Sequence, residues 1–478
     1  MSQVVSQAST RPPRRNRRPH TYIGSTTSVC PVCRSLVPAK VLCQDGRVYF
    51  DKFCPAHGGS KALVEEDVGY YLEAVRYAQP GSVPLTVSMP ARGGCPHDCG
   101  LCPRHEQHCC HPIIEITNRC NLDCPICMAD HAGKFDMPEP AFRRCVEHLL
   151  GAEGSLENLT LSGGEPTLHP QLLDFIALAT RPEIARVSLV TNGLRIAQDA
   201  AFCDALARSG AYVILQFDGL DAAADCALRG RDLVAIRQQA LAQLEAHSIP
   251  CQLLFVAARH VNEHQLGQAL DLLLQKPFIL SLAVQPLADA REGIAVDPLD
   301  RLTVSGTIRA LARQSRGVLR ADDFFPLPCP DPRCVSLTYL LGTAQGEWVP
   351  IPRFADIRRH LTMLAESATI APSQELEDSL HEIVSDLWST AGECPRNERV
   401  VSAVRRLFEG LADRAKDGAA QRRVLETSAK SIFIHHYMDR HTFDLARVPK
   451  CCHQYSLPDG RLMPICTYNL FHRSREGS

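Results

Sequence analysis

The chain has 478 residues, of which 45% are apolar and 22% charged, and its formal net charge is −2. This composition excludes a disordered chain and a strongly basic nucleic-acid-binding protein, and the length predicts two to four domains. The sequence contains no run of about 18 or more apolar residues, so we expect no transmembrane helix. The N-terminus lacks the apolar segment that a secretory signal contains. We therefore expect a cytoplasmic protein without a nucleic-acid partner.

Residues 1–21 are predicted to form a disordered basic tail. They contain the stretch TRPPRRNRRPH, whose composition is typical of a solvated segment. The alternative is electrostatic attraction to an anionic membrane surface or to nucleic acid, and the membrane case would add peripheral contact to a cytoplasmic location.

Residues 22–79 are predicted to form a small metal module, rubredoxin-like or zinc-ribbon-like. The stretches CPVC and CPAH are metal knuckles, and KVLCQDGRVYFDKF between them predicts two strands around an Asp-Gly turn. So small a ribbon needs an ion in order to fold. Cys43 lies in a predicted strand and is expected to be packed, although it is an alternative to His57. We assign four ligands to one Zn or Fe ion: Cys30, Cys33, Cys54 and His57.

Cysteine is unusually abundant, with 22 copies, and clustered C-x2-C and C-x3-C spacings without an export signal indicate metal binding. Residues 80–112 begin as a linker and then repeat the spacing C-x3-C-x2-C, with Cys109 and Cys110 following closely. Protein can complete this site, which predicts an auxiliary [4Fe–4S] cluster, and a zinc knuckle is the alternative. The ligands assigned to it are Cys95, Cys99, Cys102 and Cys110.

Residues 113–290 alternate between apolar strand patterns and helical patterns. Six strands are predicted, in PIIEIT, NLTLSGGEP, RVSLVTNGL, AYVILQFDGL, CQLLFVAARHV and LSLAVQPL. This order predicts an α/β fold, a partial (β/α)6 TIM-type barrel in which chemistry takes place at the C-terminal ends of the strands.

The stretch ITNRCNLDCPICMAD follows the first strand and carries Cys120, Cys124 and Cys127. Three thiolates on a [4Fe–4S] cluster leave one iron without a protein ligand, so that this iron can bind a small chelating molecule. Together with GGEPT and TNG downstream, this stretch resembles the radical S-adenosylmethionine (SAM) superfamily over roughly residues 113–290. The resemblance implies that SAM supplies the missing ligands.

The resemblance also implies the SAM-binding residues. Gly163 and Gly164 allow close approach of the backbone, Glu165 accepts from the methionine ammonium, and Pro166 stiffens the turn. Polar contacts to SAM are expected from Asn192, Gln216 and Asp218. A reductant such as flavodoxin or ferredoxin would provide the electron that cleaves SAM to a 5′-deoxyadenosyl radical, and this radical abstracts hydrogen from an unactivated sp3 carbon.

Residues 291–478 are predicted to be mostly helical and to hold a second auxiliary [4Fe–4S] cluster. Its candidate ligands are Cys329, Cys334, Cys466 and one of Cys451 and Cys452. The alternative is a set of buried free cysteines.

The complete layout resembles the tetraether lipid synthase group of radical SAM proteins, members of which are also described as pterin-precursor methyltransferases. This resemblance implies one SAM-binding cluster, two auxiliary clusters and a mononuclear metal site. The main expectation is carbon–carbon bond formation between lipid hydrocarbon chains bound in an apolar tunnel. The first alternative is radical methylation of a pterin or another small heterocycle in a compact polar pocket. The second is an iron–sulfur electron-transfer or binding protein, against which the GGEP stretch argues.

Overall fold

The computed structural model describes residues 19–87, 89–90, 92–98, 100–129, 134–289, 296–365, 374–390, 395–412 and 418–473. Most of the basic tail expected at residues 1–21 lies outside these ranges. Among the described helices, none combines the length and apolar character that a membrane span needs.

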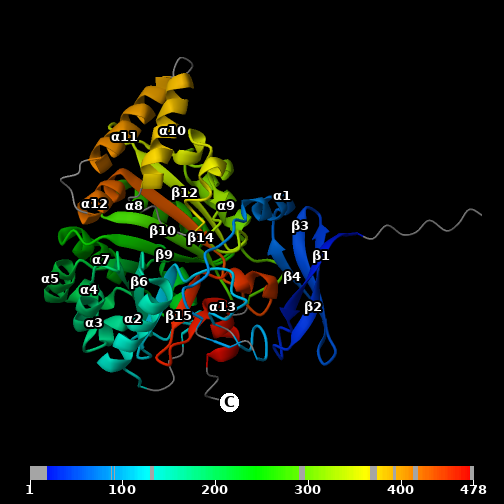
Figure 1. Cartoon of the computed structure of the whole chain (residues 1–478). Coiled ribbons are helices and arrows are strands. Elements are labelled where there is room, and N and C mark those ends of the chain that lie inside the picture. The colour runs from blue at the N-terminus through cyan, green and yellow to red at the C-terminus, as the bar shows by residue number, and fades with distance from the viewer. Residues whose placement is uncertain are drawn as a thin grey trace, which may run out of the picture.

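An antiparallel sheet of four strands forms the N-terminal module, which lies to one side of the main sheet (Figure 1). Its strands are β1 (Thr21–Val29), β2 (Leu36–Gln44), β3 (Arg47–Cys54) and β4 (Gly58–Glu65). The hairpin expected from the Asp-Gly turn is confirmed between β2 and β3. Asp45 and Gly46 both have positive φ, at 51° and 74°, as a tight hairpin turn requires.

Six parallel strands follow, each paired with the one before it, as the alternating pattern predicts. They are β5 (His111–Thr117), β6 (Leu159–Gly163), β7 (Val187–Thr191), β8 (Tyr212–Gln216), β9 (Cys251–Ala257) and β10 (Ile279–Pro286).

The region after residue 290 contributes more than helices, because its strands extend the sheet at both edges. β14 (Ala429–His435) pairs parallel with β10 and antiparallel with β12 (Val335–Gly342), which carries the short strands β11 (Phe325–Pro326) and β13 (Trp348–Pro350). At the other edge β15 (His453–Ser456) pairs parallel with β5 and is followed by β16 (Leu462–Pro464).

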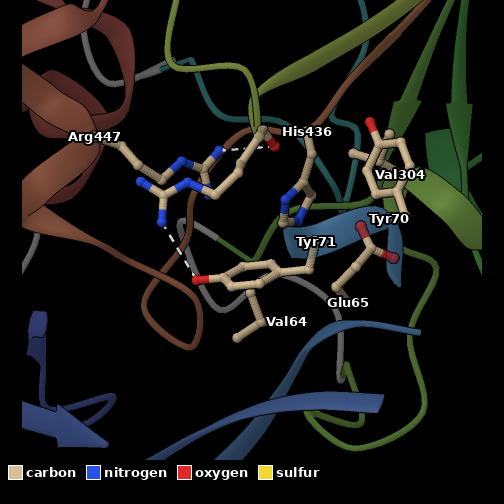
Figure 2. A pocket seen from close by; sticks show the side chains of 8 residues that line it. Val64, Glu65, Tyr70, Tyr71, Val304, His436 and Arg447 are labelled. Atoms are coloured by element: carbon tan, nitrogen blue, oxygen red, sulfur yellow. Dashed lines mark hydrogen bonds between the residues drawn. The ribbon is translucent and has the colours of Figure 1, made fainter. Parts of the chain in front are cut away.

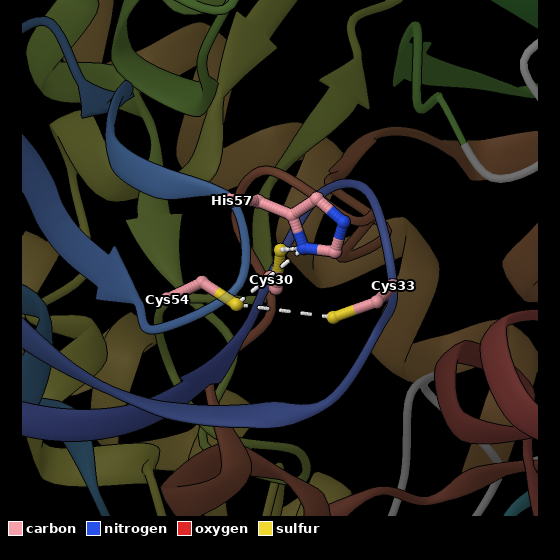
Figure 3. Close-up of side chains that lie close together, drawn as sticks. All are labelled: Cys30, Cys33, Cys54 and His57. Atoms are coloured by element: carbon pink, nitrogen blue, oxygen red, sulfur yellow. Dashed lines mark hydrogen bonds between the residues drawn. The ribbon is translucent and has the colours of Figure 1, made fainter.

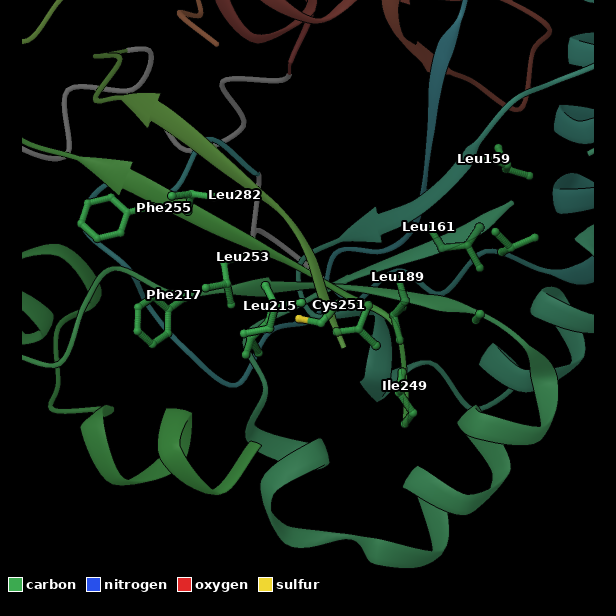
Figure 4. Close-up of a cluster of buried hydrophobic side chains, with 14 of the residues drawn as sticks. Leu159, Leu161, Leu189, Leu215, Phe217, Ile249, Cys251, Leu253, Phe255 and Leu282 are labelled. Atoms are coloured by element: carbon green, nitrogen blue, oxygen red, sulfur yellow. The ribbon is translucent and has the colours of Figure 1, made fainter. Parts of the chain in front are cut away.

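The core lies between the sheet and helices that follow the strands. Leu161, Leu189, Leu215, Leu253 and Phe255 project from four neighbouring strands into this layer (Figure 4). The helices between β5 and β12 are α2 (Glu139–Glu153), α3 (Leu172–Ala179), α4 (Leu194–Gln198), α5 (Ala200–Ser209), α6 (Ala222–Arg229), α7 (Val234–Ala246), α8 (Leu266–Gln275) and α9 (Val304–Gln314). The remaining helices are α1 (Val68–Ala74), α10 (Gln374–Thr390), α11 (Pro395–Ala412), α12 (Gly418–Ser428), α13 (Ile465–Thr467) and a π-helical turn (Tyr468–His472).

Hydrogen bonds fasten the N-terminal module to the rest of the chain. The buried ammonium of Lys52 donates to the carbonyls of Val29, Arg440 and His441, at 2.9–3.2 Å. The amide of Leu63 donates to the carbonyl of Pro298 at 2.7 Å. The module is therefore packed against the C-terminal region and is not suspended on a free linker.

Candidate metal centres and active site

Four predicted ligands of the N-terminal module converge at the ends of its hairpins (Figure 3). His57 Nδ1 lies 3.6 Å from both Cys30 Sγ and Cys54 Sγ, and Cys33 Sγ lies 3.9 Å from Cys54 Sγ. Zn–S bonds of about 2.3 Å and Zn–N bonds of about 2.05 Å in a tetrahedral site place ligand atoms about 3.5–3.8 Å apart. The spacing therefore suits one metal ion. The alternative ligand, Cys43, instead pairs with Val48 within the sheet.

Cys120, Cys124 and Cys127 lie on the loop that follows β5. The amide of Leu122 donates to Cys120 Sγ at 3.4 Å, and the amide of Cys127 donates to the Cys124 carbonyl at 3.0 Å. Burial raises the pKa of Cys120 to about 11, and the neighbouring thiolates of Cys124 and Cys127 raise it further. Each of these thiolates makes ionisation of its neighbours less favourable. Binding of a cationic iron–sulfur core would stabilise the thiolate forms.

The Gly163–Gly164 turn after β6 fixes the start of this loop. Gly164 donates its amide to the Thr117 carbonyl at 2.8 Å, and Glu165 donates to the Arg119 carbonyl at 2.7 Å. A Cβ atom on Gly163 would lie 2.1 Å from the Thr117 carbonyl oxygen, and one on Gly164 would lie 2.3 Å from the Arg119 carbonyl oxygen. Any side chain here would displace the backbone that leads into Cys120.

The carboxylate of Glu165 is buried and joins the ends of β6 and β7. It accepts from the amide and hydroxyl of Thr167, the hydroxyl of Thr191 and the amide of Asn192, at 2.6–3.1 Å. Burial raises the pKa of Glu165 and these donors oppose the rise. Glu165 is the expected acceptor for the ammonium of SAM, but its Oε1 atom already accepts three hydrogen bonds from the protein. Pro166 opens the short 3-10 turn that follows (Pro166–Leu168).

The side chains of Asn192 and Gln216 also make protein contacts. Asn192 donates to Asn121, inside the three-cysteine loop, at 2.7 Å and accepts from the amide of Leu194. Gln216 donates to Asp218 at 2.8 Å and to the Leu254 carbonyl at 3.1 Å. Asn192 therefore ties the end of β7 to the cysteine loop.

Asp218 is 1% exposed and anchors two arginines. Its Oδ2 accepts from Arg229 Nε at 2.6 Å and from Arg237 Nη2 at 3.2 Å, while Oδ1 accepts from the Val256 amide. Burial alone would raise the pKa of Asp218, but the two guanidinium groups hold it below its usual value. In this structure the carboxylate faces protein groups, not an open site.

Arg229 is a site residue that spacing rules do not reveal. Its guanidinium lies beside the Cys124 thiol, and its Nη2 atom is buried without a hydrogen-bond partner among the described residues. A buried donor of this kind is costly unless something accepts from it. A thiolate at Cys124 can accept from this guanidinium, and its interaction with Arg229 opposes the rise in the pKa of Cys124 that burial causes.

A second cysteine group forms at the other end of β5, where Cys110, Cys329 and Cys452 converge. The Sγ atoms of Cys110 and Cys329 are 3.0 Å apart. The spacing in the sequence suggests that Cys110 completes the site of Cys95, Cys99 and Cys102, but the structure places it elsewhere. The reason is strand pairing: β15 pairs with β5 so that His453 lies opposite His111, which brings the preceding residues together.

The remaining C-terminal cysteines form a separate neighbourhood. Burial raises the pKa of Cys451, and the nearby thiolates of Cys466, Cys452 and Cys334 raise it further. Arg447 donates to Cys334 Sγ at 3.0 Å. The set expected at one second auxiliary cluster is therefore divided between two groups. Cys95 packs against the apolar cluster that contains Cys466, Cys102 is half-buried, and Cys99 lies outside the described residues.

The inner face of the barrel carries both polar and apolar half-buried side chains. Along β9, β10 and β14, buried residues that face the helices alternate with half-buried ones that face inward. Register places Ser431, Ser281 and Gln252 side by side on these three strands. The inward-facing polar residues of the barrel are Glu115, Ser162, Gln216, Gln252, Ser281, Gln285, Ser431 and His435. Leu254, Val256, Ala283 and Phe433 lie on the same face, so it offers a ligand both hydrogen-bonding groups and apolar contacts.

A small cavity lies between the N-terminal module and the C-terminal region (Figure 2). Glu65, Tyr70, Tyr71, His436 and Arg447 are among the residues that line it. Burial raises the pKa of Glu65 to about 7, and hydrogen bonds from Ser305 and Thr303 limit the rise. The cavity is therefore bordered by a carboxyl group that titrates near neutral pH.

Comparison with known proteins found two matching families and a relative of similar length. The family described as the radical SAM superfamily matches residues 114–273, and the HMPTM N-terminal zinc ribbon domain matches residues 22–66. The 7,8-dihydro-6-hydroxymethylpterin dimethyltransferase of Methanocaldococcus jannaschii is 28% identical over 479 residues, which cover 94% of each chain.

Two further similarities cover less of the chain. The GTP 3′,8-cyclase of Synechococcus elongatus is 30% identical over 186 residues, which are 37% of this chain and 55% of that enzyme. The crystal structure of Streptococcus suis SuiB bound to S-adenosylmethionine aligns with a TM-score of 0.37 at 16% identity, over 42% of this chain and 46% of SuiB.

Proposed function

Because this chain carries a radical SAM domain, we propose that it is a radical methyltransferase whose substrate is a reduced pterin. The relative from Methanocaldococcus jannaschii, which matches nearly end to end, is named for methylating 7,8-dihydro-6-hydroxymethylpterin. The match to the zinc ribbon domain at residues 22–66 extends the similarity to the N-terminal module. The comparisons thus favour the pterin alternative over the lipid reading.

The observation that carries the proposal is the similarity to the pterin-methylating relative over 94% of the chain, and the inner face of the barrel offers polar groups for such a substrate. Glu115, Gln252, Gln285 and His435 face inward and are half-buried. A hydrocarbon chain placed there would remove water from these groups without offering hydrogen bonds in return. A pterin offers donors and acceptors around its ring, so that it can replace the lost water.

A radical SAM domain implies a [4Fe–4S] cluster and S-adenosylmethionine, and the residues present fit both. We assign Cys120, Cys124 and Cys127 as the cluster ligands. When bound, the two groups supply a one-electron cleavage of the sulfonium and hence radical chemistry at an unreactive carbon. The chain's part is positional: Gly163 and Gly164 hold the cysteine loop, and Arg229 places its guanidinium beside the Cys124 thiol.

The other metal sites serve the same enzyme. We assign a single zinc or iron ion to the N-terminal module and auxiliary clusters to the two remaining cysteine groups. Cys110 and Cys120 flank β5, so the auxiliary site at Cys110 and the SAM site lie at opposite ends of the inner face. A reductant of the ferredoxin or flavodoxin class would supply the electrons.

The test compares pterins from cells that produce the wild type with those from cells that produce a variant in which Cys120, Cys124 and Cys127 are all alanine. We expect methylated pterins, identified by mass spectrometry, only with the wild type. Unmethylated pterins, together with 5′-deoxyadenosine formation by the purified wild type under anaerobic conditions, would overturn the pterin assignment and leave SAM cleavage standing. Lipids extracted from the same cells test carbon–carbon coupling of hydrocarbon chains.

A further inference from the structure

The last described residue, Arg473, folds back onto the inner face of the barrel. Its guanidinium forms a two-point ion pair with Glu115 of β5, with Nη1 3.1 Å from Oε2 and Nη2 2.8 Å from Oε1. The rings of Tyr455 and Tyr468 lie 5.2 and 4.9 Å from its central carbon. The Arg473 side chain is only 7% exposed, whereas Glu115 is 23% exposed. A planar cation that lies against two aromatic rings is thus paired with the Glu115 carboxylate.

This pair lies near the three-cysteine loop. Glu115 stands between Ile114 and Ile116, which belong to the core, so its side chain points to the inner face. Asn469 accepts from Arg473 Nε at 2.9 Å and donates to the sulfur of Met128 at 3.8 Å. Met128 directly follows Cys127, so one C-terminal turn contacts both the ion pair and the cysteine loop.

The contacts of Arg473 match the chemistry of a pterin ring. A guanidinium presents two parallel N–H donors in one plane, which a carboxylate binds at two points. The 2-amino-4-oxopyrimidine edge of a pterin presents the same fork, from its ring N–H and its amino group. Aromatic side chains can stack against either planar group, the guanidinium or the pterin ring.

We propose that Glu115 is the carboxylate that binds the aminopyrimidinone edge of the substrate, and that Arg473 occupies this subsite until the substrate displaces it. The inference rests on the proposed pterin substrate. Exchange is feasible because the guanidinium and the pterin edge make equivalent bonds to Glu115, and because Arg473 stands at the end of a short helical turn. When an internal group competes for the subsite, the apparent affinity equals the intrinsic affinity multiplied by the fraction of molecules in which the subsite is open.

The test measures binding of 7,8-dihydro-6-hydroxymethylpterin to the purified full-length protein by anaerobic calorimetry. Arg473→Ala should tighten binding roughly 10-fold, because the subsite is then open in every molecule. Glu115→Gln should weaken binding at least about 10-fold, because an amide cannot accept at two points. Arg461→Ala is the matched control, since this half-exposed arginine pairs with Asp459 and should leave the affinity unchanged.

Two further measurements test whether Arg473 occupies the substrate's subsite or only stabilises the fold. Guanidinium ion at low millimolar concentration should compete with the pterin in Arg473→Ala but not in the wild type. Lumazine, which has an oxygen in place of the amino group, should bind the wild type and Glu115→Gln equally. If the wild type binds the pterin while Arg473→Ala binds it more weakly and guanidinium does not compete, the subsite assignment fails and the proposed function stands. Absence of pterin binding by the wild type would instead remove both.

Discussion

Arg229 donates from its Nε atom to Asp218 at 2.6 Å, and this buried ion pair holds a guanidinium beside the thiol of Cys124. Arg237 completes the arrangement from the neighbouring helix. The pair links the end of β8 to the cysteine loop, so the loop's position depends on a carboxylate that lies about 90 residues further along the chain.

Replacing Asp218 with alanine should destabilise the protein strongly. The change leaves two buried guanidinium groups without their shared partner, which costs about 3–5 kcal/mol. Chemical denaturation of the anaerobically purified proteins measures the loss. Asp221→Ala is the control, because this more exposed carboxylate caps α6 and lies 3.8 Å from the exposed His264, so that its removal should cost about 1 kcal/mol. Equal losses in the two variants would contradict the assigned role of Asp218.

Gly164→Ala should abolish 5′-deoxyadenosine formation while the protein remains folded. The added Cβ atom would lie 2.3 Å from the Arg119 carbonyl oxygen, so the backbone before Cys120 must move. Gly151→Ala is the matched control, since nothing lies within 4 Å of its added Cβ and alanine favours the helix by about 1 kcal/mol. Anaerobic turnover of SAM, measured by chromatography, distinguishes the two. Full activity in Gly164→Ala would show that the turn does not position the loop.

Local patterns were sufficient to predict the barrel strands and the residues at their ends. The apolar stretches from PIIEIT to LSLAVQPL coincide with β5 to β10 because strand length and flanking turns are encoded locally. The Asp45-Gly46 turn is a local signal of the same kind. The four ligands of the N-terminal module could likewise be grouped from their spacing, because each knuckle contributes two neighbours in the sequence.

Contacts between distant segments could not be predicted in this way. Cys110 and Cys452 are 342 residues apart and meet through the pairing of β15 with β5, which no local pattern specifies. Cys329 joins them from the segment between β11 and β12. The strands after residue 290 join the sheet at its two edges, where tertiary pairing decides their place. Arg229 also belongs to no recognisable sequence motif, because its role follows from where the fold buries its guanidinium, beside Cys124.

Cys110 and Cys329 should behave as ligands of one cluster. Cys110→Ser and Cys329→Ser should each lose the same amount of iron and sulfide, and the double variant should lose no more. Cys226→Ser, at an exposed cysteine of α6, should retain the full amount. Iron and sulfide analysis after anaerobic reconstitution provides the measurement. Additive losses in the double variant would place the two thiols at different clusters.

The N-terminal module should depend on His57 and not on Cys43. His57→Ala removes one of four converging ligands, so its metal should be lost to a chelator at least about 10-fold more readily than that of the wild type. Cys43→Ser should behave as the wild type, because Cys43 lies in the β2–β3 pairing. Chelator competition followed by elemental analysis measures the loss and identifies the ion as zinc or iron. Loss of metal in Cys43→Ser with retention in His57→Ala would reverse the assignment.

Glu65 should make stability fall as the pH rises. Burial raises its pKa from 4.5 to about 7. The folded state therefore binds this proton more tightly than the unfolded state, and the stabilisation is present in full below about pH 4.5 and lost as the pH passes 7. Glu65→Gln keeps an oxygen for Ser305 and Thr303 but cannot ionise. The stability difference between this variant and the wild type should therefore change in favour of the variant by about 3 kcal/mol between pH 4.5 and pH 8. Anaerobic chemical denaturation at several pH values measures it, and a difference that does not depend on pH would mean that Glu65 keeps one protonation state throughout.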